Sequence, residues 1–210
     1  MKMGLLVFAR EPLPGRVKTR LAASVGDRAA AKLYDTMLVA VLKTAGELSG
    51  VERVVFWDCD EASLPDLATR YRCNSRRQAP GDLGQRMGGA FDEMFAEGCD
   101  TCCIIGSDAP DLPLHYLQEA FRLLEERQVD VVFGPSVDGG YYLLGVRRPW
   151  PELFCGIPWS SSAVLAQSLA IVCERGGTSA LLPEWQDIDT VEDLNAFRQR
   201  TGMAESGESG

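Results

Sequence analysis

The chain has 210 residues, of which 46% are hydrophobic and 24% are charged, a composition typical of one soluble globular domain rather than two. Its formal net charge of −9 argues against binding nucleic acid through a general positive field. No apolar stretch is as long as a membrane span, and the first, Met3 to Ala9, is too short for a signal peptide core, so we expect no membrane span and a cytoplasmic location. Seven cysteines, an odd number, favour reduced thiols, and a single histidine argues against His-based nucleophilic catalysis.

The apolar run from Met3 to Ala9 predicts a strand that is buried on both faces. A loop that Pro12, Pro14 and Gly15 keep open follows it. The basic residues of this loop are Arg10, Arg16, Lys18 and Arg20. In an extended segment the last three lie on one side, where they suit the phosphates of one small anionic ligand. The alternative is a solvated basic turn. The loop has neither a Walker A pattern nor G-x-G-x-x-G.

The next elements follow from periodicity and caps. We expect a helix over 27–48 capped by Asp27, a strand over 53–57, a short helix over 62–71 and a strand over 73–78. The glycine-rich segment 80–91 leads into a helix that reaches about Glu97. Gly84 and Arg86 could bind phosphate or sugar hydroxyls there. Tight helix packing, or pairing with a neighbour, explains both residues almost as well.

The stretch 102–113 is an apolar strand that stops at a glycine and is followed by Asp108 and Asp111. Carboxylates on a stiff turn after a buried strand can hold Mg²⁺ or Mn²⁺, and both are candidate ligands. In the alternative reading Asp111 caps the helix predicted over 113–127.

Two strands, 129–134 and 141–146, are too close for a parallel crossover and must be antiparallel neighbours. Asp138, Gly139 and Gly140 lie in the turn between them, where the glycines leave room for a ligand against the backbone. A simple hairpin turn would also use Asp-Gly.

The remainder predicts a serine-capped helix over 160–174, an edge segment over 181–189, a capping box that opens a helix at Thr190, and a disordered tail over 203–210. Segments 159–162 and 187–190 are further site candidates, and Asp189 could supply another carboxylate. The alternation predicts an α/β fold with a mixed, mainly parallel sheet and helices on both faces. Because ligands bind at the carboxyl ends of the strands, the loops after Ala9, Ile105 and Phe133 should meet there, with cations for phosphate beside carboxylates for a metal.

Three segments together, Phe8–Leu21, Gly106–Pro113 and Gly134–Tyr141, resemble the DUF2064 family, the radical-SAM/selenodomain-associated transferase 1 group. The resemblance covers roughly 1–200. It implies a single-domain, Rossmann-like glycosyltransferase-A (GT-A) fold with a seven-stranded sheet, a first loop that wraps a nucleotide's phosphates, and a metal on Asp108. The usual Asp-x-Asp appears as Asp108-Ala109-Pro110-Asp111, which leaves the role of Asp111 open.

This resemblance implies a nucleotide-dependent transferase. In glycosyl transfer from a nucleotide-sugar, Mg²⁺ or Mn²⁺ on Asp108 neutralises the leaving diphosphate and Asp138 acts as base for a small-molecule acceptor. In the alternative, nucleotidyl transfer from a nucleoside triphosphate, Lys18 and Arg20 stabilise pyrophosphate. A third hypothesis is a non-catalytic nucleotide or metabolite sensor, against which the retained carboxylates argue. The acceptor and the oligomeric state are not predictable from the sequence.

Overall fold

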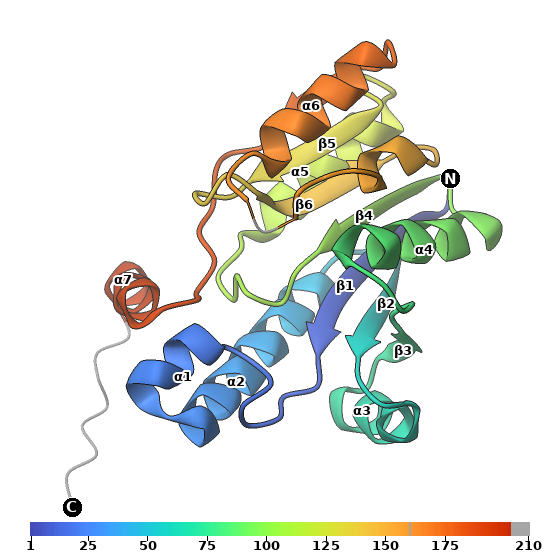
Figure 1. Cartoon of the computed structure of the whole chain (residues 1–210). Coiled ribbons are helices and arrows are strands. Elements are labelled where there is room, and N and C mark those ends of the chain that lie inside the picture. Colours follow the sequence, from blue (N-terminus) through green and yellow to red (C-terminus); the bar gives the residue numbers. More distant parts are fainter. Residues whose placement is uncertain (160, 203–210) are drawn as a thin grey trace, which may run out of the picture.

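Apolar segments form most of the strands of a seven-stranded sheet in the computed structural model, which describes residues 1–159 and 161–202 (Figure 1). In chain order the strands are β1 (Met3–Arg10), β2 (Val51–Asp58), β3 (Asn74–Arg77), β4 (Thr101–Ile105), β5 (Val131–Pro135), β6 (Tyr141–Val146) and β7 (Ser179–Leu181). Their order across the sheet is β3-β2-β1-β4-β6-β5-β7.

Only β6, among the described strands, runs antiparallel to its neighbours. It pairs antiparallel with both β4 and β5, whereas β1 pairs parallel with β2 and β4. The expected mixed, mainly parallel sheet is therefore confirmed, as is the antiparallel pair on either side of the turn at Asp138. The carboxyl ends of the parallel strands and the start of β6 consequently meet at one edge.

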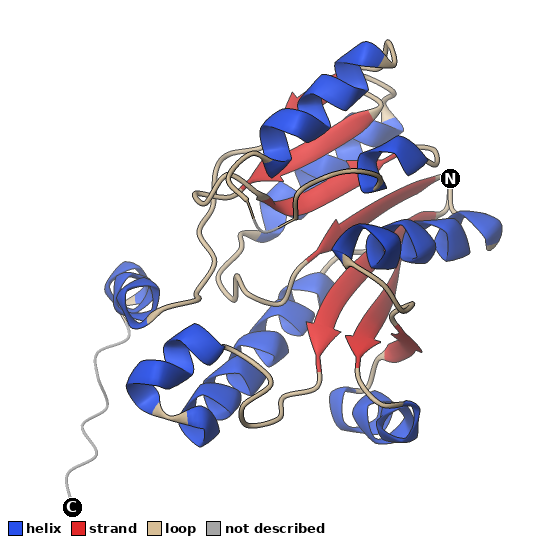
Figure 2. Ribbon diagram, in the orientation of Figure 1, coloured by secondary structure: helices blue, strands red, loops and turns tan. Residues whose placement is uncertain are grey.

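Helices cover both faces, as Figure 2 shows. They are α1 (Thr19–Val25), α2 (Asp27–Gly46), α3 (Leu64–Tyr71), α4 (Leu83–Ala96), α5 (Leu114–Glu125), α6 (Val164–Glu174) and α7 (Val191–Thr201), with 3₁₀ turns η1 (Glu61–Ser63) and η2 (Pro151–Phe154). Alternate residues of β1 point to opposite sides: Leu5 and Val7 pack with α2, α3 and α5, while Leu6 packs with α4, η2 and α6. A third cluster joins α1, α2 and α7 through Leu21, Met37 and Leu194.

Several predicted helix starts differ from the structure. The basic loop does not stay extended to Arg20, because α1 begins at Thr19. Asp27 is the first residue of α2 and follows its N-cap, Gly26. Helix α6 begins at Val164 after Ala163, without a side-chain cap from the described serines; Ser160 lies outside the described residues. The capping box at Thr190 is present as predicted, with Asp193 as its partner.

The predicted disordered tail, 203–210, lies outside the described residues. Within the described part of the chain, no helix combines the length and the apolar character that a membrane span requires.

Candidate functional site

A pocket of about 850 Å³ opens at the carboxyl edge of the sheet. Residues from the ends of β1, β2 and β4 and from the start of β6 line it, together with residues from α4 and the segment before α7. Its polar and charged lining residues are Arg10, Lys18, Thr19, Arg20, Tyr34, Asp58, Gln78, Arg86, Ser107, Asp108, Ser136, Asp138, Tyr141, Tyr142, Ser161, Asp187 and Asp189. The three loops that the sheet rule brings together therefore do meet.

Lys18 lies at the acidic end of this pocket. Its Nζ is 2.6 Å from Asp108 Oδ1 and 2.8 Å from Asp189 Oδ1, and its side chain is only 4% exposed. Burial lowers the pKa of Lys18, but the two carboxylates outweigh burial, so the pKa is raised and the ammonium stays charged. The contact between Lys18 and Asp189 joins residues that are 171 positions apart in the sequence.

The backbone at Lys18 is left-handed, with φ 48° and ψ 46°. A residue with a side chain pays about 1–2 kcal/mol for this conformation. The preceding Val17 is buried, and the carbonyl of Lys18 accepts a hydrogen bond from Ala22 N at 2.8 Å, which opens α1. The turn thus holds Val17 in the core and directs Lys18 to the carboxylates.

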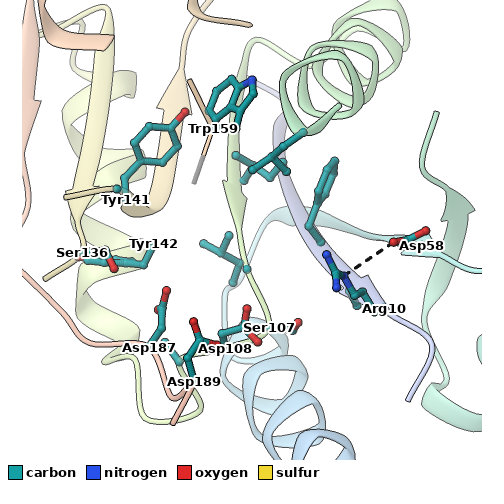
Figure 3. Close-up of a pocket in the computed structure, with 18 of the residues that line it drawn as sticks. Arg10, Asp58, Ser107, Asp108, Ser136, Tyr141, Tyr142, Trp159, Asp187 and Asp189 are labelled. Carbon is teal, nitrogen blue, oxygen red and sulfur yellow. Dashed lines mark ion pairs between the residues drawn. The ribbon is translucent and has the colours of Figure 1, made fainter. Parts of the chain in front are cut away.

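Asp187 and Asp189 come from an extended segment between β7 and α7. Ile188, between them, is 1% exposed and packs with α1 and α7, and its N–H donates to Asp108 O at 3.0 Å. Because side chains of an extended segment alternate, the two acids point the other way, toward Asp108 (Figure 3). The Asp-Ile-Asp pattern was available in the sequence and could have identified Asp187 individually.

The carboxyl group of Asp187 has a raised pKa. Burial raises its pKa to about 7, and the negative charges of Asp108, Asp189 and Asp138 add to this effect, whereas Lys18 opposes it. The cluster therefore holds more negative charge than one ammonium neutralises.

Arginines occupy the opposite side of the pocket. Arg10 Nε is 3.8 Å from Asp58 Oδ2, and Arg86 Nη1 is 3.1 Å from the same oxygen (Figure 3 shows the first pair). Gln78 is held by donating to Ala9 O and Phe56 O, and its Oε1 accepts from Arg86 at 3.3 Å. The pocket is consequently basic and hydrogen-bonding at one side and acidic at the other.

Tyr34, from α2, links the ends of the two central strands. Its hydroxyl accepts the N–H of Arg10 at 2.8 Å and shares a hydrogen bond with Ser107 Oγ at 2.8 Å. Burial raises the pKa of Tyr34 to about 12, so the hydroxyl is neutral at physiological pH.

Most of the predicted site residues line the pocket. These are Arg10, Lys18, Arg20, Arg86, Asp108, Asp138 and Gly140. Five do not: Gly15, Arg16, Gly84, Gly139 and Asp111. The sequence did not single out Tyr34, Ser107 or Gln78, which only the tertiary structure brings to the pocket.

Three of the predicted residues outside the lining, Gly84, Gly139 and Asp111, pack against or pair with other parts of the protein. A Cβ on Gly84 would lie 2.5 Å from Phe154 O and 2.7 Å from Trp159 Nε1, which matches the tight-packing alternative. Gly139 has φ 89° and faces the backbone of Ser162. Asp111 Oδ2 is 2.7 Å from Arg200 Nε, and Asp111 Oδ1 accepts from Trp185 Nε1 at 3.4 Å. Asp111 does not cap α5, whose N-cap is Pro113.

The acidic end of the pocket supplies only part of the ligand set that a divalent cation needs. Within 1–159 and 161–202, no three His, Cys, Asp or Glu side chains are arranged to hold a metal by themselves. Mg²⁺ is commonly bound by one or two carboxylates plus the phosphates of a substrate. Asp108 and Asp189 already share the Lys18 ammonium, and their oxygens provide part of a ligand set for Mg²⁺.

The chain belongs to the family DUF2064, described as an uncharacterised protein conserved in bacteria, whose model matches residues 41–161. No curated protein matches the chain.

Solved structures share the fold. A candidate nucleotide-diphospho-sugar transferase from Desulfovibrio desulfuricans is 33% identical, with a TM-score of 0.90 over 98% of this chain and 90% of that one. CMP:2-keto-3-deoxy-manno-octonic acid synthetase, solved with CTP, is 13% identical, with a TM-score of 0.63 over 96% and 99%. Glucosyl-3-phosphoglycerate synthase from Mycobacterium tuberculosis, solved with Mn²⁺, UDP and glucosyl-3-phosphoglycerate, is 13% identical, with a TM-score of 0.55 over 98% and 82%. The last two show likeness of fold alone.

Proposed function

We propose that the chain is a nucleotide-dependent transferase that moves a glycosyl group from a nucleotide-sugar to a small-molecule acceptor. One observation carries the proposal. Two carboxylates, Asp108 and Asp189, are bridged by the Lys18 ammonium and face arginines across a pocket at the carboxyl edge of the sheet. The 33% identical structure, itself a candidate nucleotide-diphospho-sugar transferase, supports the same class of donor.

The residues divide the work by charge. Arg10, Arg20 and Arg86 line the pocket and would hold the donor's diphosphate through charge-assisted hydrogen bonds. Asp108 and Asp189 would hold Mg²⁺ or Mn²⁺, which supplies positive charge to the leaving nucleoside diphosphate. Asp111 has no part in this arrangement.

Asp138 is the proposed base. It lines the pocket, and its Oδ1 accepts the N–H of Gly140 at 3.0 Å, which orients the carboxylate. The acceptor oxygen gains a bond to the anomeric carbon, the bond from that carbon to the diphosphate breaks, and the hydroxyl proton passes to Asp138.

Nucleotidyl transfer is a second candidate, because the cations Lys18, Arg10 and Arg20 that line one pocket also suit a triphosphate. An acceptor phosphate would then attack the α-phosphorus, and the leaving group would be pyrophosphate.

The products distinguish the reactions. We would incubate the protein with a panel of nucleotide-sugars and nucleoside triphosphates, with Mg²⁺ or Mn²⁺ and a pool of sugar, phosphate and carboxylate acceptors, and quantify nucleoside diphosphate and pyrophosphate. Nucleoside diphosphate supports glycosyl transfer and pyrophosphate supports the second candidate. Nucleotide-dependent thermal stabilisation without either product would indicate the binding-protein hypothesis, and its absence as well would contradict all three.

A further inference from the structure

The position of Lys18 differs from the one its sequence context suggests. The basic loop predicts a phosphate-binding lysine, yet the structure buries its ammonium between Asp108 and Asp189, the carboxylates proposed for the metal. We propose that the Lys18 ammonium and a divalent cation compete for Asp108 and Asp189, so that Lys18 leaves the two carboxylates when Mg²⁺ or Mn²⁺ binds between them. This inference concerns the regulation of the proposed transferase site and rests on that proposed function.

The contact geometry makes the ammonium and a metal ion competitors. Nζ approaches one oxygen of each carboxylate, at 2.6 and 2.8 Å, so it uses lone pairs that a divalent cation would also need. The Lys18 side chain is 4% exposed, whereas the side chains of Asp108 and Asp189 are 41% and 49% exposed, so a cation in the pocket can reach the carboxylates but finds their two Oδ1 atoms already bridged by Nζ. A metal that bridges the same two oxygens therefore requires the ammonium to move.

The charge of the cluster favours the exchange. Asp108 and Asp189 already bring two carboxylates to one ammonium, and the acidic side chain of Asp187 lies beside them (Figure 3 shows the three acids). Replacing a single positive charge by a double one neutralises more of this cluster. Asp138 adds a further negative charge at the same pocket.

The released ammonium can bind the phosphates of a ligand in the same pocket. The backbone of Lys18 is fixed at the start of α1, but its side chain has a flexible four-carbon stem. The pocket that it lines also holds Arg10 and Arg20, where a ligand's phosphates would accept the ammonium. Metal and nucleotide should then bind cooperatively, because the nucleotide accommodates the lysine that the metal displaces.

The first test measures Mn²⁺ binding to the full chain without nucleotide, by the electron paramagnetic resonance signal of free Mn²⁺. We expect Lys18→Met to bind Mn²⁺ at least tenfold more tightly than the wild type. Lys32→Met, at an exposed position on α2, removes the same charge away from the pocket and should bind as the wild type does. Equal or weaker binding by Lys18→Met, in a variant with an unchanged circular dichroism spectrum, would overturn the proposal.

The second test uses the wild type only, so it does not depend on how a variant folds. Lysine acetylation by acetic anhydride would be followed by mass spectrometry with and without Mn²⁺. We expect the rate at Lys18 to rise at least threefold with Mn²⁺, while the rate at Lys32 stays constant. An unchanged acetylation rate at Lys18, at every Mn²⁺ concentration that the mass spectrometry tolerates, would overturn the exchange.

These measurements separate the inference from the proposed function. Cation exchange in a protein that releases neither nucleoside diphosphate nor pyrophosphate would keep the inference and refute the transferase. Product release without faster acetylation of Lys18 would keep the transferase and refute the exchange.

Discussion

Tyr34 connects the two loops that carry Arg10 and Asp108, and its hydroxyl is the only part of the side chain that a change to phenylalanine removes. Tyr34→Phe leaves the N–H of Arg10 without its acceptor, so we expect the free energy of unfolding to fall by about 1–2 kcal/mol. Urea denaturation measures this loss. Tyr71→Phe, which removes a hydroxyl that donates to Asp35 outside the pocket, is the matched control for nucleotide binding. Only Tyr34→Phe should weaken nucleotide binding; equal effects would contradict a role in positioning the loops.

The raised pKa of Asp187 predicts a pH-dependent stability. An aspartate titrates near 3.9 when unfolded, whereas Asp187 titrates at about 7 in the fold. Between these values the folded state binds more protons, so this group makes the wild type less stable as pH rises from 4 to 7. Asp187→Asn removes the penalty.

We therefore expect Asp187→Asn to be more stable than the wild type at pH 8, by about 1–2 kcal/mol after allowance for solvent screening, and similar to it at pH 4. Urea denaturation at several pH values, in a chelating buffer, measures the difference. Asp92→Asn, at an exposed position on α4, controls for net charge. A constant difference between Asp187→Asn and wild type across this range would refute the assignment.

At the scale of elements, substitutions in α4 test how tightly one wall of the pocket is packed. Gly84→Ala places a methyl group against Phe154 O and Trp159, so we expect a loss of about 1–3 kcal/mol in the free energy of unfolding. Gly89→Ala in the same helix meets nothing closer than Ala79 Cβ, at 3.6 Å, and should stabilise the protein by about 0.5–1 kcal/mol. Thermal unfolding compares the two. Similar shifts in both variants would mean that the wall relaxes around the added methyl group.

At the scale of elements, the sequence predicts strands better than helix starts. Apolar runs that end at turn residues form β1, β4 and β6, which lie where the pattern placed them, whereas β7 overlaps the predicted edge segment 181–189 only at Leu181. The start of α1 depends on the left-handed conformation of Lys18, which tertiary contacts impose and local propensity disfavours. Asp27 and the two described serines before α6, Ser161 and Ser162, have capping chemistry but do not cap a helix.

At the scale of the whole molecule, the site consists of contacts that no local pattern contains. The sheet rule correctly brought the loops with Arg10, Asp108 and Asp138 together, because the strand ends are a property of the topology. The pair between Lys18 and Asp189 depends on how the segment before α7 returns to the sheet edge, where Ile188 is buried. Roles for the individual residues remain predictions.

Asp108 and Asp111, the two acids of the stretch 102–113, allow a test of the whole assembly. Asp108 contacts Lys18 in the pocket, whereas Asp111 pairs with Arg200 of α7 outside its lining. A nucleotide at one hundred times its dissociation constant stabilises the fold by about 2.7 kcal/mol. We expect Asp108→Ala to lose the Mg²⁺-dependent part of this stabilisation. The stability of the nucleotide-free protein should change little, because Asp189 still pairs with Lys18 and removal of the Asp108 charge reduces the repulsion on Asp187.

Asp111→Ala should behave in the opposite way. Breaking its partly buried ion pair with Arg200 should cost about 1 kcal/mol without nucleotide, while the Mg²⁺-dependent stabilisation persists. Thermal shift with nucleotide, with and without Mg²⁺, measures both variants side by side. If Asp111→Ala also lost the Mg²⁺-dependent part, Asp111 would be a metal ligand after all, and the carboxylate pair proposed here would have to include it.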